Sequence, residues 1–143
     1  MSWKYATDGT TIHIGRGTPL TDDEGGLSMW IMVSGPYTAG GADKERRQAH
    51  LRELNLAALD VARLGHLPIV AVNLVLPMIE LDGTVDAYET IMEPVAGALA
   101  SRCDACFGIG GPSPGADAEV EQFRRLGKPV FRSLDEVPSL TLV

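Results

Sequence analysis

The stretch Ala105–Glu119, which reads A-C-F-G-I-G-G-P-S-P-G-A-D-A-E, decides the fold class. Its apolar start, Ala105–Ile109, is typical of a buried strand. A Gly-rich turn follows, and helical spacing then continues over Ala116–Leu126, with an apolar stripe formed by Ala116, Val120 and Phe123. A strand, a Gly-rich loop and a helix in this order are typical of an α/β domain that binds ligands at the loop.

The remainder of residues 29–143 alternates strand and helix patterns in the same way. The predicted strands are Met29–Val33, Pro68–Val72, Pro129–Arg132 and a weaker one at Leu140–Val143. The predicted helices are Asp43–Leu64, which Gly65 ends, and Val85–Arg102, which Pro94 can kink or break. Asn73–Gly83 is expected to be a loop, and Ser133–Val137 a short closing turn.

This alternation predicts a parallel sheet with helices on both faces. We therefore expect a flavodoxin- or Rossmann-like three-layer sandwich with four or five strands. In such folds ligands bind beyond the carboxyl ends of the strands. The loops Ser34–Gly41 and Gly110–Gly115 both follow strands, so we expect them to share one site.

Residues 1–28 differ from this pattern and are interpreted as an extension. Lys4–Thr7 and Thr10–Ile14 flank Asp8-Gly9, a sequence that favours a β-hairpin turn with positive φ. Arg16–Gly26 is expected to be a polar loop.

Charge and composition indicate which kinds of molecule the protein can bind. The net charge is −7 and no long basic stripe occurs, which argues against binding to polymeric nucleic acid but leaves a single nucleotide open. No apolar run approaches the roughly 20 residues that span a bilayer. Met1–Lys4 lacks the features of a secretory signal, so a cytoplasmic location without membrane contact is expected.

The metal-ligating residue types form no metal pattern. Cys103 and Cys106 make a C-x-x-C pair where a helix gives way to a strand, so they are interpreted as packed core thiols. The histidines (His13, His50 and His66) lie on separate elements without metal spacing, and Trp3 and Trp30 are interpreted as packing residues. We expect neither a metal nor an organic cofactor.

The Gly-rich loop has the chemistry of an anion or sugar site. Gly110, Gly111 and Gly115 allow a ligand to approach the backbone closely, and Ser113 offers a hydroxyl beside the helix N-terminus. Glu119 borders the apolar stripe, where the helix dipole is expected to keep a partly buried carboxylate ionised. Such a group suits a nucleophile or an electrostatic stabiliser, although a surface residue that complements the dipole fits the pattern equally well.

The other loop, S-G-P-Y-T-A-G-G over Ser34–Gly41, offers hydroxyls and glycines that suit a sugar. Its candidate binding residues are Ser34, Gly35, Pro36, Gly40 and Gly41. Basic residues follow at the start of the next helix, where they either clamp a phosphate or are simply solvated: Lys44, Arg46 and Arg47.

Taken together, S-G-P-Y-T, R-C-D-A and G-G-P-S-P-G-A-D-A-E resemble the nucleoside 2-deoxyribosyltransferase-like superfamily over about Met29–Pro138. That group includes deoxyribosyltransferases and 2′-deoxynucleoside 5′-monophosphate N-glycosidases. The resemblance implies that Glu119 attacks the anomeric carbon, and that Ser113 contacts a 5′-phosphate. With Ser113, the resemblance extends substrate binding to Gly111, Gly115 and Ala116, and it implies a homodimer or higher homo-oligomer.

The sequence departs from this superfamily at the site. Relatives carry a nucleophile-orienting Tyr where this chain has Met32 or Val33, and an acidic Asp near Ala96. Tyr37 and Glu93 are the candidate replacements, with Asp82, Asp86 and Glu89 as looser candidates for the acid. Without an acid, departure of the base would lose a contribution of about 10²–10⁴-fold.

Three functions therefore remain open from the sequence. The first is an N-glycosidase or deoxyribosyltransferase-like enzyme acting on a nucleotide or nucleoside. The second is a catalytically weak nucleotide-binding or sensor protein, and the third is a structural or partner-binding domain.

Overall fold

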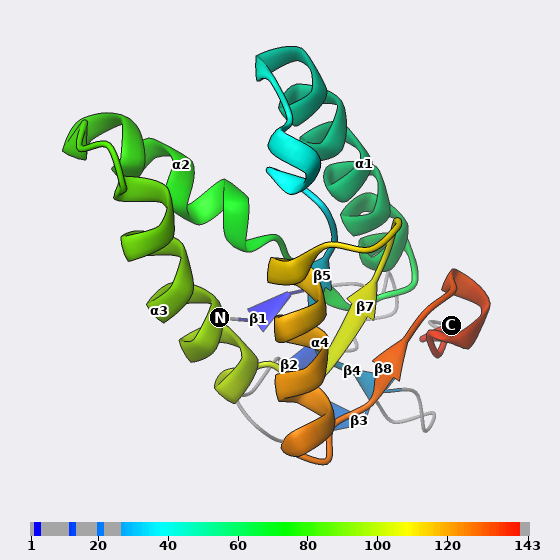
Figure 1. The fold of residues 1–143 in the computed structure, drawn as a ribbon. Coiled ribbons are helices and arrows are strands. Elements are labelled where there is room, and N and C mark those ends of the chain that lie inside the picture. Colours follow the sequence, from blue (N-terminus) through cyan, green and yellow to red (C-terminus); the bar gives the residue numbers. More distant parts are fainter. Residues whose placement is uncertain (1, 4–11, 14–19, 22–26, 141–143) are drawn as a thin grey trace.

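The computed structural model describes residues 2–3, 12–13, 20–21 and 27–140. A parallel sheet in the order β6-β5-β7-β8 forms its centre (Figure 1). Its strands are Trp30–Ser34 (β5), Leu67–Ile69 (β6), Ala105–Gly108 (β7) and Val130–Phe131 (β8). The helices are Lys44–Arg63 (α1), Ala71–Asp82 (α2), Ala87–Arg102 (α3) and Pro114–Arg125 (α4), with short 3-10 turns at Ala39–Gly41 and Leu134–Glu136.

The strand order places the topological switch point of the sheet at the neighbouring strands β5 and β7. α1 covers one face of the sheet, while α4 covers the other face and α3 packs beside α4 (Figure 1). The adjacent strands β5 and β7 thus lead into helices on opposite faces, which is the position where open α/β sheets bind ligands. The predicted α/β fold with a parallel, three-layer arrangement is confirmed.

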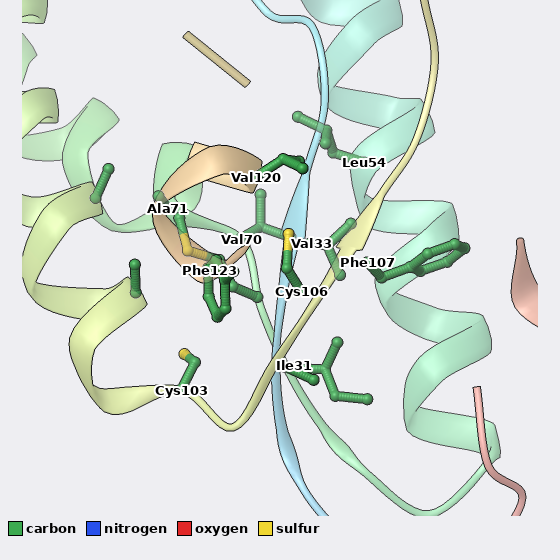
Figure 2. Close-up of a cluster of buried hydrophobic side chains, with 14 of the residues drawn as sticks. Ile31, Val33, Leu54, Val70, Ala71, Cys103, Cys106, Phe107, Val120 and Phe123 are labelled. Atoms are coloured by element: carbon green, nitrogen blue, oxygen red, sulfur yellow. The ribbon is translucent and has the colours of Figure 1, made fainter. Parts of the chain in front are cut away.

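The core consists of the two faces of β5 and β7 and the helices that cover them. Because parallel neighbours in register point to the same face, Met32 and Cys106 lie on one face, and Val33 and Phe107 on the other. Figure 2 shows Cys106 on the side of Val120 in α4, and Phe107 toward α1. The largest fully buried side chain is Phe123 of α4.

Side chains cap the N-termini of two helices. Asp43 accepts a hydrogen bond from the backbone of Arg46 at the start of α1, at 2.8 Å. At the start of α4, the side chain of Ser113 accepts a hydrogen bond from the backbone of Ala116. α3 continues through Pro94 without a break.

The expected loop at Asn73–Gly83 is wrong, because α2 occupies nearly all of it. The exposed face of this helix includes the apolar residues Leu74, Met78 and Leu81, which weakens the contrast between a polar and an apolar face. Pro77 lies inside the helix, and no side chain caps its N-terminus. The helix ends at Gly83, whose left-handed φ of 68° suits glycine.

The two ends of the chain are described only in part. Ser2–Trp3 (β1) pairs with Ile12–His13 (β2), and Leu20–Thr21 (β3) pairs with Leu27–Ser28 (β4), both antiparallel. The predicted turn at Asp8-Gly9 lies outside the described residues, and β3 replaces part of the expected polar loop. Leu140 belongs to no strand, and residues 141–143 lie outside the described part.

Both cysteines are buried free thiols, as the sequence predicted. Burial raises the pKa of Cys103 to about 12 and that of Cys106 to about 11, so both stay protonated. Among the described helices, none has the length and apolarity required to cross a membrane.

Lys128 closes the C-terminal end of α3. Its Nζ donates hydrogen bonds to the carbonyl oxygens of Ala100, Ser101 and Cys103 at 2.9, 2.9 and 2.7 Å. These carbonyls lack helical partners, and a cation there also complements the negative end of the helix.

We predict that Lys128→Met lowers the free energy of unfolding by about 2 kcal/mol, because it leaves these carbonyls without a charged donor. Urea unfolding followed by circular dichroism measures this loss. Lys44→Met, at the exposed start of α1, is the control and should change stability by less than about 0.5 kcal/mol. Equal effects of the two substitutions would contradict the assigned role of Lys128.

Candidate functional site

The loops that follow β5 and β7 pack against each other. A Cβ atom on Gly35 would lie 2.8 Å from Cγ1 of Ile109, so only glycine permits this approach. Gly110 has a φ of 76°, and a Cβ atom there would lie 2.8 Å from Cδ of Pro36. The expectation that the two loops meet is therefore confirmed.

A cavity of about 310 Å³ opens where these loops meet the starts of α2, α3 and α4. Eight of the predicted site residues line it: Ser34, Gly35, Tyr37, Gly40, Ser113, Gly115, Ala116 and Glu119. Apolar side chains complete its wall, among them Leu54, Val72 and Met92. A mostly apolar cavity with a few convergent polar groups is typical of small-molecule sites.

The other predicted site residues lie outside this cavity. Pro36 contacts the opposite loop at Gly110, and Gly41 lines a neighbouring cavity. Gly111 is exposed, with open space around its α-carbon. Glu93 is exposed on α3 and lines a different cavity.

The basic residues at the start of α1 do not form a phosphate clamp here. Lys44, Arg46 and Arg47 are exposed and are absent from the residues that line the cavity. Arg47 instead donates through Nε to the carbonyl oxygen of Ala42 at 3.0 Å. Within the described part of the chain, the cavity lining contains no Lys or Arg, so polar contacts must come from hydroxyls, backbone N–H groups and Glu119.

Ser113 is the N-cap of α4 and is buried. Its Oγ accepts a hydrogen bond from the backbone N–H of Ala116 at 3.5 Å. The hydroxyl proton is then available for donation into the cavity, beside the N–H groups of the first turn of α4. Ser113 can thus donate to a sugar hydroxyl or a phosphate while it caps the helix.

Glu119 lies in the second turn of α4 at the cavity wall. Burial raises the pKa of its carboxyl group, and a hydrogen bond from Ser34 counteracts part of this increase. The sequence analysis expected the helix dipole to keep Glu119 ionised, and burial opposes this by raising the pKa. Asp117, in the first turn, takes the dipole-complementing position instead.

A second cavity of about 400 Å³ adjoins the first. The two share Tyr88, Met92, Gly115 and Glu119 in their walls. The second is also lined by charged and polar side chains of α3 and α4: Glu89, Glu93, Gln122 and Arg125. Glu119 therefore faces two adjoining spaces. Of the looser acid candidates, Asp82 and Asp86 line neither space, whereas Glu89 lines the second.

Tyr88 belongs to the site, and the sequence analysis did not identify it. Its ring stacks on that of Tyr37, with centroids 5.8 Å apart and planes at 24°. Burial and the charge of Glu119 raise the pKa of Tyr88 to about 12, so its hydroxyl stays protonated at neutral pH. The sequence did contain a signal for Tyr88. Residues 88, 92 and 96 lie on one face of a helix, and residue 96 is the position where an acid was expected.

At both positions where the sequence departs from the superfamily that it resembles, the structure has an apolar side chain. Met32 is fully buried in the core and offers no hydroxyl. Ala96 is 6% exposed and contributes only a methyl group to the second cavity. Ser34, however, lies two residues beyond Met32 on the same face of β5, so a hydroxyl does reach this side of the strand.

His50 and His66 serve structural roles. Nδ1 of His66 accepts a hydrogen bond from the backbone N–H of Met29 at 3.0 Å, and its other nitrogen contacts the carbonyl oxygen of Pro138. Burial lowers the pKa of His66. His50 bonds the carbonyl oxygen of Tyr37 at 2.8 Å. In the described residues, no group of three or more His, Cys, Asp or Glu side chains gathers as metal ligands.

Comparison with known proteins supports the assignment of the fold. No model of a known protein family matches the chain, and no curated protein matches it. A similar solved structure is that of a 2-deoxyribosyltransferase from the psychrotolerant bacterium Bacillus psychrosaccharolyticus. The TM-score is 0.51 at 23% identity, over 71% of this chain and 69% of that chain. At this identity the likeness concerns the fold, which is the Rossmann-type fold that the resemblance implied.

We predict that Glu119→Gln raises the melting temperature at neutral pH, because the neutral amide removes the cost of burying a charge. The raised pKa means that the folded state binds the proton more tightly than the unfolded state. The gain should therefore shrink as pH falls toward 4.5, the ordinary value for glutamate. Differential scanning fluorimetry across pH measures it. Glu121→Gln, exposed on the same helix, is the control, and a gain that is independent of pH would contradict the prediction.

Proposed function

We propose that this protein cleaves the N-glycosidic bond of a nucleoside or nucleotide, with Glu119 as the nucleophile. The observation that carries the proposal is the position of Glu119, half-buried in a cavity between the two strand-end loops. Its raised pKa is typical of a carboxyl group with a chemical role, and the Rossmann-type fold is shared with a 2-deoxyribosyltransferase.

In the proposed reaction, a Glu119 oxygen forms a bond to the anomeric carbon as the bond to the base breaks. The base leaves with the electron pair of the broken bond and takes up a proton. Water then attacks the glycosyl ester and releases the sugar, or a second base attacks and gives a new nucleoside. The first outcome is hydrolysis and the second is transfer.

The leaving base needs a hydrogen-bond donor. Tyr37 and Glu93 are the residues proposed from the sequence, and the structure adds Tyr88. Tyr88 lines both cavities beside Glu119 and keeps its proton at neutral pH, whereas Glu93 is exposed and lines only the second cavity. Tyr88 is therefore the strongest of the three candidates as donor to the base.

The polar groups of the cavity suit a sugar that carries few charges. Ser113 and the N–H groups of α4 offer donors to a 5′-hydroxyl or a 5′-phosphate. No Lys or Arg lines the described part of this cavity, so the binding of a phosphate would rest on these donors alone. The dimer that the resemblance implies stays a prediction, which light scattering of the purified protein tests.

We predict that the protein releases free base from at least one member of a panel of deoxynucleosides, ribonucleosides and their 5′-monophosphates, as measured by chromatography. Glu119→Gln should lower the rate by at least about a thousandfold, as expected when a covalent nucleophile is removed. Glu121→Gln should keep the wild-type rate. Base release that persists unchanged in Glu119→Gln would contradict the assignment of the nucleophile.

We predict that Tyr88→Phe lowers kcat by about 100-fold with little change in KM, because it removes the donor to the base and keeps the ring stacked on Tyr37. Steady-state kinetics on the best substrate of the panel measure both constants. Glu93→Gln is the comparison and should have a smaller effect. A larger loss in Glu93→Gln than in Tyr88→Phe would assign the acid to Glu93 instead.

A second candidate function is nucleotide binding without turnover. It is favoured by the apolar Ala96 at the position where an acid was expected. Absence of base release together with a raised melting temperature in the presence of a nucleoside 5′-monophosphate would support it.

A further inference from the structure

The second cavity, of about 400 Å³, contains a polar side chain that the proposed reaction does not use. Its walls come from α3 and α4, which pack side by side (Figure 1), and Gln122 of α4 is half-buried in one of them. Gln122 lies one turn after Glu119, so the two share a face of the helix, with a rise of about 4.5 Å between them. A molecule that reacts at Glu119 therefore meets Gln122 as it extends along this cavity.

A hydrogen bond to α3 fixes the orientation of the Gln122 amide. Its Nε2 donates to the carbonyl oxygen of Gly97 at 3.3 Å. A carbonyl oxygen can only accept, so the NH₂ end of the amide must face Gly97. The reverse orientation would set two acceptors against each other. Oε1 of Gln122 is therefore an acceptor whose position is set by the contact between the two helices.

This acceptor borders open space in the second cavity. Gly97 lines the same cavity as Gln122. Beyond its own helix, a Cβ atom on Gly97 would find one atom of the described residues within 4 Å, which is Oε1 of Gln122 at 4.0 Å. The space beside Gly97 is thus unfilled by side chains, and Oε1 stands at its edge.

The shape of the second cavity suits a flat ring. Small residues of both helices line it: Ala96 and Gly97 of α3, and Gly115 and Ala118 of α4. Such walls leave room for a planar group and present it with an apolar surface. The first cavity, which would hold the sugar, adjoins the second at Glu119 and Tyr88. A nucleoside can therefore lie across both cavities, with its base between the helices.

We propose that Oε1 of Gln122 selects bases that carry an amino group at the edge remote from the sugar. The inference rests on the proposed function for the identity of the ligand. Adenine and cytosine present an exocyclic NH₂ at this edge, which can donate to Oε1. Hypoxanthine and uracil present a carbonyl oxygen at the same positions, which would leave two acceptors facing each other.

The other polar groups of the second cavity agree with a ligand that donates hydrogen bonds at this edge. Glu89 and Glu93 are exposed carboxylates of α3, which only accept when ionised. Tyr88 keeps its proton and supplies a donor at the glycosidic end. Arg125 is exposed and lies one turn beyond Gln122, at the C-terminal end of α4. Gln122 is thus the acceptor that the helix contact holds between the two donors.

The test is the binding of matched nucleosides to the Glu119→Gln protein, in which the ligand stays intact during the measurement. Isothermal titration calorimetry compares deoxyadenosine with deoxyinosine and deoxycytidine with deoxyuridine, and then the corresponding ribonucleosides. The amino member of each pair should bind about tenfold more tightly, which is the scale of one hydrogen bond. Equal binding of the two members in every pair, or no binding of any nucleoside, overturns the proposal.

Substitutions of Gln122 assign the preference to its acceptor. Gln122→Met keeps the size of the side chain and removes the acceptor, so it should abolish the preference, whereas Gln122→Glu keeps an acceptor and should retain it. Gln48→Met is the matched control, because Gln48 is exposed on α1 and lines neither of these two cavities. If Gln122→Met does not fold, Gln122→Lys, which has donors and no acceptor, decides the question by reversing the preference. A preference that survives these substitutions of the acceptor overturns the role of Gln122.

Gly97→Met tests where the base lies. The longer side chain would occupy the open space beside Oε1, and methionine favours a helix more than glycine does, so the fold should be kept. Binding of the amino and the oxo member of each pair should weaken together. Unchanged binding of both members would overturn the placement of the base in the second cavity.

Binding is measured without turnover, so this inference and the proposed function can fail separately. An amino preference that depends on Gln122, in a protein whose wild type releases no base, supports the inference and refutes the proposed function. Base release by the wild type, with equal binding of amino and oxo nucleosides, supports the proposed function and overturns the role of Gln122.

Discussion

The close approach of the loops after β5 and β7 is the constraint on which the site depends. Gly35 and Gly110 permit it, since a side chain at either position would overlap the opposite loop. The contact brings the start of α4 against the end of β5, and it thereby brings Glu119 to Ser34. A residue on the second turn of a helix and a residue at the end of a strand come to line the same cavity only through this packing.

The same packing sets the ionisation of Glu119 through two opposing effects. Burial disfavours the carboxylate, and the hydrogen bond from Ser34 favours it. A fully solvated carboxylate would be a weaker nucleophile, and one buried without a donor would remain protonated near neutral pH. Tyr88 responds to the same surroundings, since burial and the charge of Glu119 together keep its hydroxyl protonated. The site thus pairs an ionisable carboxyl group with a neutral donor.

The sequence predicted the elements that carry local signals and missed those that depend on tertiary contacts. α1 and α4 were predicted because their apolar residues recur at helical spacing and Gly65 marks the end of α1, and the Gly-rich loop lies at the cavity. α2 was missed because it exposes apolar residues and contains Pro77, both of which are unusual for a surface helix. Tyr88 was missed because an aromatic residue near the start of a helix usually indicates packing. The contact of Ser34 with Cys106 joins two strands distant in sequence, and spacing alone cannot reveal it.

Mass spectrometry of the acid-quenched protein after incubation with substrate is the most direct test that Glu119 is the nucleophile. The account predicts that the mass rises by that of one glycosyl group, located on the peptide that contains Glu119 and absent in Glu119→Gln. A protein that releases base at the same rate in Glu119→Gln, with no glycosyl group on this peptide, would contradict the account.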